Sequence, residues 1–153
     1  MDKQSLKTKQ KGVITELQCI TYFYELGYPV SIPYGDNSRY DFIVDIDGCL
    51  LRIQVKTSRE LDDGNVIEFS CRSTRVNSGG AVYRRYTSDE IDYFATYYKN
   101  ECYLVPVQEC AVNKKLRINP AKNNQKSCIN LAEDYRADIQ IKELLSLRQA
   151  FNQ

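Results

Sequence analysis

The sequence predicts a mixed α/β fold from three features of its 153 residues. In the middle, two runs of alternating apolar and polar residues, 39–46 and 49–56, flank the dipeptide Asp47-Gly48. That dipeptide suits a two-residue type I′ turn, so the segment is predicted to form a β-hairpin. Apolar residues recur at helical spacing before the hairpin, over about residues 8–26, and near the end of the chain, over about residues 136–151.

The composition limits the fold and the environment. A chain of this length suits one domain, spanning residues 1–153, and its 42% hydrophobic content is typical of globular proteins. No apolar run reaches the roughly 20 residues that a membrane-spanning helix needs. We therefore expect a soluble, cytoplasmic protein without a membrane partner.

The composition also excludes several kinds of chemistry. Histidine is absent, which removes Ser-His and Cys-His catalysis and His-ligated metal sites. The six cysteines are scattered without a C-x-x-C motif, so we expect reduced thiols rather than a zinc site or a disulfide framework. No feature calls for an organic cofactor. The net charge is only +1, so a nucleic-acid partner can be inferred only from local clustering of basic residues.

The predicted hairpin brings three polar side chains together. A two-residue turn pairs Ile46 with Cys49, and counting back along both strands places Asp41 opposite Gln54. Directly paired residues have Cβ atoms about 5 Å apart, and the diagonal neighbour Lys56 lies on the same face at about 7–8 Å. The opposite face, with the apolar residues of both strands, is expected to face the core.

These side chains suit a hard divalent cation such as Mg²⁺ or Mn²⁺. Mg²⁺ prefers oxygen ligands, which Asp41, the side chain of Gln54 and the carbonyl of Val55 could supply, with water and a substrate phosphate completing the shell. Lys56 would then orient the nucleophile or offset negative charge that develops during reaction. The alternative is a solvated polar face with an ordinary cross-strand pair.

The spacing Asp41, twelve residues, then Gln54-Val55-Lys56 resembles the signature of the PD-(D/E)-XK nuclease superfamily. Within it, the chain looks most like the small group I intron-encoded homing endonucleases, which use Gln in place of the second acid. This resemblance implies a restriction-endonuclease-like αβββαβ core with a central mixed sheet and an added C-terminal helix. It also implies metal-dependent, sequence-specific hydrolysis of double-stranded DNA, and assembly as a homo-oligomer, with a tetramer favoured over a dimer.

A carboxylate on the first predicted helix adds to the resemblance. Val13, Leu17, Ile20 and Tyr24 define its apolar stripe, and Glu16 falls beside Ile20 and Phe23 on the helical wheel. A carboxylate on a core face needs a partner. In the resembled nucleases an acid on the first helix projects toward the metal site, and Glu16 matches it here. The alternative is a glutamate at the edge of the stripe that reaches water.

The remaining elements are predicted from local patterns. Residues 28–34 are expected to form a short edge strand, 66–72 a third strand after the hairpin, 102–107 a buried strand and 115–118 a further strand. Thr87 and Glu90 match a capping box, which predicts a helix that continues to about Lys99. The C-terminal helix should place Ile141, Leu144, Leu145, Arg148 and Phe151 toward one side, for packing or for self-association.

Basic residues gather in two places that could contact DNA. The first is a loop around residues 77–80, and the second is an N-terminal arm of about residues 1–11; a solvated surface is the alternative in each case. Arginine forks suit phosphates and guanine edges. The candidate DNA-contacting residues are Arg72, Ser73, Arg75, Arg84 and Arg85 in the loop, Lys7, Lys9 and Lys11 in the arm, and Arg39 beside the hairpin.

Three other functions remain open from the sequence. A Holliday-junction resolvase and a type II restriction endonuclease share the fold, but both normally keep an acid where Gln54 stands. A DNA-binding protein with a decayed site is the third, because exchanging an acid for Gln removes one negative charge from the metal site.

Overall fold

The predicted β-hairpin forms the centre of the computed structural model, which describes residues 7–123, 125 and 127–152. Strands β2 (Phe42–Ile46) and β3 (Cys49–Val55) pair antiparallel, with Ile46 opposite Cys49 and Phe42 opposite Ile53. The turn residues Asp47 and Gly48 have φ values of 50° and 86°. Both values are positive, as a type I′ turn requires, so the predicted turn and register are confirmed.

The hairpin belongs to a central mixed sheet of order β1-β2-β3-β8-β9. Strand β1 (Val30–Ser31) forms one edge and β9 (Glu101–Pro106) the other, which confirms the strands expected at both places. Strand β8 (Tyr93–Tyr98) runs parallel to β3, whereas the other neighbours are antiparallel. The chain between β3 and β8 must therefore cross over, and it carries the remaining β-structure.

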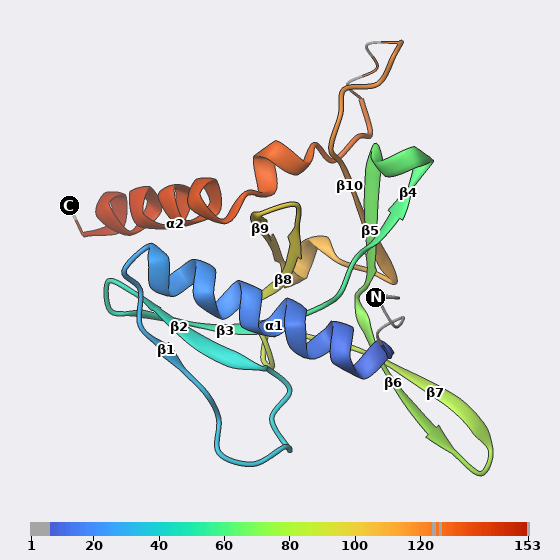
Figure 1. Cartoon of the computed structure of the whole chain (residues 1–153). Coiled ribbons are helices and arrows are strands. Elements are labelled where there is room, and N and C mark those ends of the chain that lie inside the picture. The colour runs from blue at the N-terminus through green and yellow to red at the C-terminus, as the bar shows by residue number, and fades with distance from the viewer. Residues whose placement is uncertain (1–6, 124, 126, 153) are drawn as a thin grey trace, which may run out of the picture.

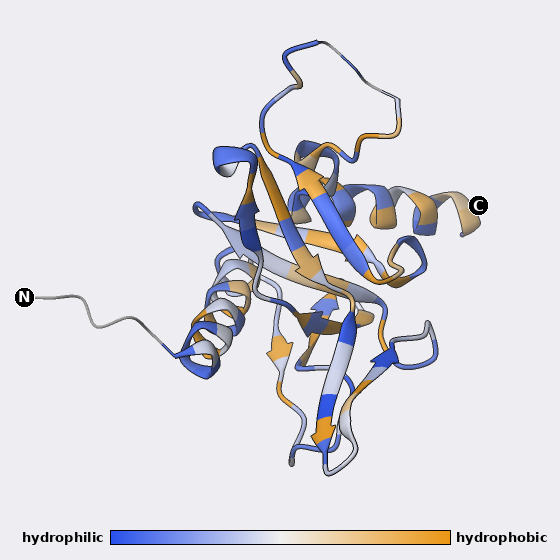
Figure 2. Ribbon diagram, turned by 90° about the vertical axis from the view of Figure 1, so that its right-hand side faces the viewer, coloured by the Kyte–Doolittle hydropathy of each residue, from blue (hydrophilic) through white to orange (hydrophobic). Residues whose placement is uncertain are grey.

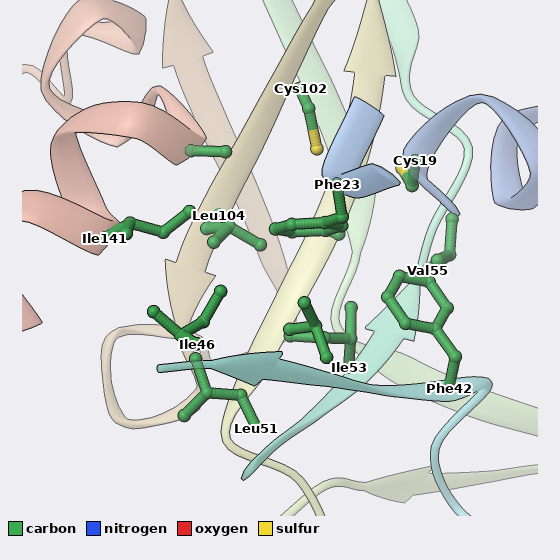
Figure 3. Close-up of a cluster of buried hydrophobic side chains, with 13 residues drawn as sticks. Cys19, Phe23, Phe42, Ile46, Leu51, Ile53, Val55, Cys102, Leu104 and Ile141 are labelled. Atoms are coloured by element: carbon green, nitrogen blue, oxygen red, sulfur yellow. The ribbon is translucent and has the colours of Figure 1, made fainter. Parts of the chain in front are cut away.

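Two helices cover one face of this sheet: α1 (Thr8–Glu25) and α2 (Ala137–Phe151). Their bounds agree with the helices predicted from the sequence. Phe23 of α1 and Ile141 of α2 join one buried cluster with Leu104 of β9 and the apolar face of the hairpin (Figure 3). Hydrophobic and hydrophilic residues alternate along both helices (Figure 2).

A second, antiparallel sheet packs on the other face. It has the order β10-β5-β4, with β4 (Arg59–Leu61), β5 (Val66–Ser70) and β10 (Asn113–Arg117). Ile67, Phe69 and Leu116 of this sheet form a second cluster with Phe94 and Val105 of the central sheet. The strands expected near residues 66–72 and 115–118 thus exist, but they form a separate sheet. Three 3-10 turns complete these layers: η1 (Asp62–Gly64), η2 (Val107–Glu109) and η3 (Ala132–Tyr135).

The basic segment predicted as a loop is a two-stranded ribbon. Strand β6 (Arg72–Asn77) pairs antiparallel with β7 (Gly80–Arg85), and both are largely exposed. The ribbon projects from the body of the molecule (Figure 1). Because it buries little apolar surface, pairing between its strands and contacts at its base hold it in place.

The helix predicted from Thr87 to about Lys99 is wrong, because this segment contains β8. The capping contacts do form, since Thr87 N donates to Glu90 Oε2 (3.2 Å) and Glu90 N to Thr87 O (3.0 Å). They close only one turn. The chain then extends because Asp92 N donates to Arg52 O (2.9 Å) and the Asp92 carboxylate accepts from the Arg52 N–H (2.8 Å) and guanidinium. The aromatic and β-branched run that follows suits a strand buried on both faces.

The predicted packing face of α1 is also wrong. Val13, Leu17 and Tyr24 are 56%, 57% and 57% exposed, whereas Thr15, Cys19 and Phe23 are buried. The buried side is rotated by roughly a third of a turn from the predicted stripe. Small or weakly polar residues such as Thr15 and Cys19 do not stand out as hydrophobic in a sequence. The predicted packing face of the helix was therefore based on the larger apolar residues, which are exposed.

The fold class is confirmed: the chain is mixed α/β, with a central mixed sheet and a C-terminal helix. One domain over residues 1–153 remains a prediction. Neither helix among the described residues is long and apolar enough to cross a membrane.

Truncating Phe23 tests the packing face of α1. Phe23 is fully buried and stacks edge-on against Phe42 at 5.9 Å between ring centroids. We expect Phe23→Ala to lower the free energy of unfolding by about 3–5 kcal/mol in urea denaturation. Leu17→Ala on the same helix should change it by about 0.5 kcal/mol or less, because Leu17 is exposed. If Leu17→Ala lowered the free energy of unfolding more than Phe23→Ala, the apolar stripe predicted from the sequence would be the buried side of α1 after all.

Candidate active site

Asp41 lies directly before β2, and its side chain contacts that of Gln54 in β3, the residue that the sequence places opposite it. The pairing of β2 with β3 ends at Phe42 and Ile53, and Asp41 N donates to the same Ile53 O (2.8 Å), so the backbone departs from the regular ladder at Asp41. The carboxylate then turns back along β3: Asp41 Oδ2 accepts from the Val55 N–H (2.7 Å) and from Gln54 Nε2 (2.9 Å). Burial raises the pKa of Asp41, and the Val55 N–H and the charge of Lys56 oppose this rise.

The side-chain amide of Gln54 turns its nitrogen, not its oxygen, toward Asp41. Gln54 Nε2 also donates to Val55 O (3.2 Å). The amide therefore bridges the two other oxygen groups predicted from the sequence as metal ligands. A half-turn of the terminal amide would place its oxygen on the same side and change the amide from a donor to a possible ligand.

These residues fit a magnesium-type cation. Asp41 Oδ1 makes no hydrogen bond with another described residue, so this oxygen remains available. No three His, Cys, Asp or Glu side chains gather to hold a metal ion anywhere in the described part of the chain. The donor set at β3 is thus one carboxylate with neutral oxygens. Such a set suits Mg²⁺, which keeps several waters and often completes its shell with a substrate phosphate.

Lys56 follows β3 and points toward the base of the ribbon. Its backbone N–H donates to Ala95 O (2.8 Å), so pairing with β8 fixes where the side chain starts. Lys56 Nζ donates to Arg72 O (3.0 Å) at the first residue of β6. Burial lowers the pKa of Lys56, while the charges of Asp41 and Cys71 oppose this change and that of Arg39 adds to it.

Glu16 is half-buried on α1 and lies within electrostatic range of the hairpin. Burial raises its pKa, and the negative charge of Asp41 raises it further. No hydrogen bond joins Glu16 to Asp41, Gln54 or Lys56 among the described residues. The helix is held beside the site by a contact between Thr15 Oγ1 and Thr57 Oγ1 (3.0 Å). The structure therefore brings Glu16 near the site without a direct contact.

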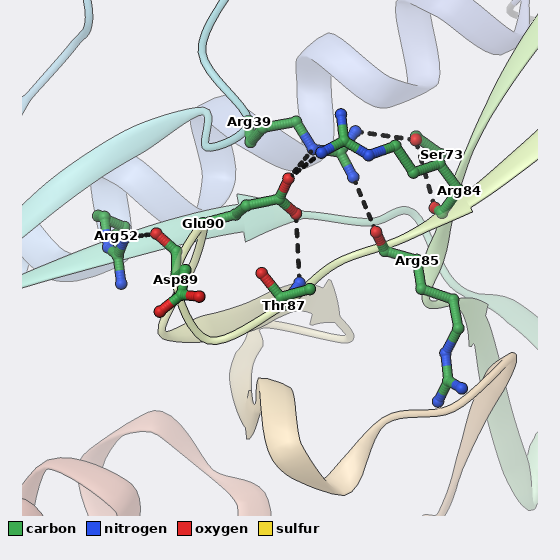
Figure 4. A network of polar contacts seen from close by, with 8 residues as sticks. All are labelled: Arg39, Arg52, Ser73, Arg84, Arg85, Thr87, Asp89 and Glu90. Atoms are coloured by element: carbon green, nitrogen blue, oxygen red, sulfur yellow. Dashed lines mark hydrogen bonds and ion pairs between the residues drawn. The ribbon is translucent and has the colours of Figure 1, made fainter.

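A polar network at the base of the ribbon contains a residue that the sequence placed only in a helix cap. Glu90 accepts from the guanidinium of Arg84 and lies 3.4 Å from Arg39 Nε (Figure 4). Arg39 also donates to Ser73 Oγ (2.9 Å) and to Arg85 O (3.1 Å), so it contacts both strands of the ribbon. Since Arg39 lies two residues before Asp41, this network connects the ribbon to the hairpin.

The predicted DNA-contacting residues differ in whether their side chains already make contacts within the protein. Arg39, Ser73 and Arg84 take part in the network, and the Arg72 guanidinium lies over the Tyr83 ring at 4.3 Å from the centroid. The exposed Arg75 and Arg85 form no side-chain ion pair or hydrogen bond with the described residues. Lys7, Lys9 and Lys11 are exposed at the start of α1. The rest of the proposed arm, residues 1–6, lies outside the described residues.

A family model for the PD-(D/E)XK endonucleases matches residues 6–138, which include the hairpin, the ribbon and Glu16. The chain belongs to this endonuclease family. The resemblance seen in the sequence is thereby confirmed, and the protein is a DNA endonuclease. A comparison with curated protein sequences gave no significant match.

The fold of this endonuclease is similar to that of a bacterial homing endonuclease, I-Ssp6803I. The two structures align with a TM-score of 0.76 over 95% of this chain and 99% of the other, at 24% sequence identity. At this identity the likeness shows a shared fold.

A charge added at position 54 tests whether this residue faces the metal. Gln54→Glu places a second carboxylate beside Asp41, so the endonuclease variant should be less stable without metal because the like charges repel. It should bind Mg²⁺ more tightly than the wild type in a calorimetric titration without DNA. Gln18→Glu, on the exposed side of α1, should leave the affinity unchanged. If Gln54→Glu also leaves it unchanged, residue 54 does not contribute to the metal site.

Proposed function

We propose that this endonuclease cuts double-stranded DNA at a specific sequence, depends on a divalent metal ion, and acts as an intron-encoded homing endonuclease. The observation that carries the proposal is the contact between the Asp41 carboxylate and the Val55 N–H, which fixes an acid beside Gln54 and Lys56. Similarity to a homing endonuclease fold supports the biological role.

Mg²⁺, or Mn²⁺ in its place, would be held by Asp41, Gln54 and the carbonyl of Val55. Glu16 would complete the outer shell of the site without binding the metal directly. When bound, the metal would supply a Lewis acid that polarises the scissile phosphate and makes a water molecule more acidic. Asp41 fixes the position of the site because the Val55 N–H anchors one of its oxygens. Gln54, which carries no charge, makes the site depend on the DNA phosphate for tight metal binding.

Lys56 would stabilise negative charge that develops on the phosphate and orient the attacking water. Its ammonium is partly buried by the surrounding chain, and it is held at Arg72 O rather than in an ion pair. A charge in such a surrounding interacts more strongly with a nearby phosphate than an exposed charge does.

The ribbon β6–β7 would enter a groove of the DNA. The major groove of B-form DNA admits a two-stranded β-ribbon. Arg75 and Arg84 share one face of this ribbon, and Arg72 and Arg85 share the other, as the pairing Arg72–Arg85 and Ser73–Arg84 requires. Contacts from Lys7, Lys9 and Lys11 at the start of α1 would add sequence-independent affinity.

Removing the ammonium of Lys56 tests its catalytic role. Lys56→Met should lower the single-turnover rate of plasmid nicking by about 10²- to 10³-fold while DNA affinity stays close to that of the wild type. Lys99→Met, in the exposed turn between β8 and β9, should cut normally. Chelation of divalent ions should abolish nicking by the wild type. Equal rates for Lys56→Met and wild type at saturating DNA would remove Lys56 from the site, and a wild type that binds DNA without nicking it would indicate a decayed site.

Neutralising single arginines tests the ribbon. Removing an arginine that contacts one phosphate should flatten the plot of log affinity against log salt by roughly 0.9. We expect this change for Arg75→Gln and Arg85→Gln, and a smaller one for Arg84→Gln because Glu90 already holds that guanidinium. An arginine that reads guanine should instead relax specificity at one base pair, at a cost of about 1–3 kcal/mol. Unchanged affinity and slope in these variants and in Arg72→Gln would leave the ribbon without a role in binding.

Cutting both strands needs two active sites, so we also propose a symmetric oligomer, a tetramer rather than a dimer, formed through α2. Leu147 and Phe151 are 61% and 88% exposed on this helix, which leaves apolar surface for an interface. Light scattering should show an assembly that Leu147→Glu weakens. A monomer both free and on DNA would contradict the proposal.

A further inference from the structure

The ring of Tyr86, the residue that follows β7, lies close to two cationic side chains of the site. Its ring centroid is 3.9 Å from Arg39 Cζ and 5.0 Å from Lys56 Nζ. Both distances are within the range in which a cation is attracted to the electron-rich face of an aromatic ring. No sequence pattern indicates this role, because Tyr86 is one of 12 tyrosines and lies 30 residues after Lys56.

The position of the Tyr86 ring is itself well fixed. The ring stacks edge-on against Phe94 of β8, with centroids 5.3 Å apart and an interplanar angle of 85°. Phe94 is buried in the core between the central and the second sheet. Tyr86 is therefore attached to the rigid core on one side and contacts the site on the other.

Lys56 is held at the base of the ribbon, by the first residue of β6 and by the residue that follows β7. Arg72 O, at the start of β6, accepts from Lys56 Nζ at 3.0 Å, and Arg72 pairs with Arg85 of β7. Tyr86 comes directly after Arg85. A single ammonium group thus has one contact from the first residue of the ribbon and another from the residue that follows its last.

We propose that Tyr86 is a positioning residue of the nuclease site, and that its ring holds the Lys56 ammonium where the scissile phosphate is attacked. This inference rests on the endonuclease function proposed above. It means that the base of the DNA-contacting ribbon sets the place of the catalytic ammonium. When the ribbon is bound in the groove of its DNA target, its base would hold Lys56 in position. When the ribbon is shifted from that place, Lys56 would lose this support.

The negative charge on the face of the residue-86 ring can be varied with little change in the size of the ring. We suggest replacing Tyr86 with phenylalanine and with its mono-, di- and trifluorinated forms, since fluorine withdraws electron density from the ring face. The phenylalanine form should cut within about 3-fold of the wild type, because the hydroxyl is not part of the proposed role. The single-turnover rate at saturating DNA and Mg²⁺ should then fall with each fluorine, by about 3- to 30-fold in total, while DNA affinity stays constant.

Two controls separate this role from general packing. Tyr98→Leu removes a comparable contact elsewhere, since the Tyr98 ring lies 5.3 Å from Lys99 Nζ, and should leave the rate unchanged. The fluorine series repeated in Arg39→Met should keep its slope if the ring acts through Lys56. Loss of the slope in that background would assign the effect to Arg39 and overturn the proposal.

A readout that does not depend on cleavage tests the contact itself. The ring current of Tyr86 should shift the proton signal of the Lys56 ε-methylene upfield in an NMR spectrum of the free protein, a signal identified by its absence in Lys56→Met. Tyr86→Leu should return it to the ordinary position. An ordinary position in the wild type, or a rate that does not respond to fluorine while the wild type still cuts, would overturn the role of Tyr86 alone. A wild type that does not cut would overturn the endonuclease function proposed above and this inference with it.

Discussion

The hydrogen bond from the Val55 N–H to the Asp41 carboxylate is the contact on which the site depends. It exists because a two-residue turn at Asp47-Gly48 sets the register of β2 and β3, and a slip by one residue would turn Asp41 to the other face. The apolar face of the same hairpin is buried beneath α1 and α2, so the core that stabilises the fold also enforces this register. The geometry of the site is therefore protected by the stability of the fold.

The ribbon is almost wholly exposed, yet it is tied to the site at two points. Arg39 joins the start of the hairpin to both ribbon strands, and Lys56 at the end of β3 donates to the first residue of the ribbon. Glu90 and Arg52 fix the turn that follows, through Arg84 on one side and Asp92 on the other. A DNA-contacting element and a catalytic centre thus share the same few contacts, which allows target binding to influence the position of catalytic groups.

Local patterns predicted the parts of the fold that are determined locally. The turn dipeptide predicted the hairpin, its register from Phe42 to Ile53 and the nearness of Asp41 to Gln54, and apolar spacing predicted both helices. The patterns failed where distant contacts decide. The capping box at Thr87 does form and predicted a helix. The residues after it form strand β8 instead, because they pair with β3 and because Asp92 accepts hydrogen bonds from Arg52. The Arg39–Glu90 contact and the place of the Tyr86 ring join segments about 50 residues apart, so no spacing in the sequence signals them.

The most direct test of this account is to locate the metal ion in the complex with DNA. Crystals grown with a target duplex and Mn²⁺ would show the ion through its anomalous scattering. The account predicts a peak within coordination distance of the Asp41 carboxylate and the Val55 carbonyl, with a DNA phosphate as a further ligand and Lys56 beside it. A phosphate backbone that passes the ribbon with no ion at Asp41, or an ion held instead by other acidic residues such as Asp62 and Asp63, would contradict it.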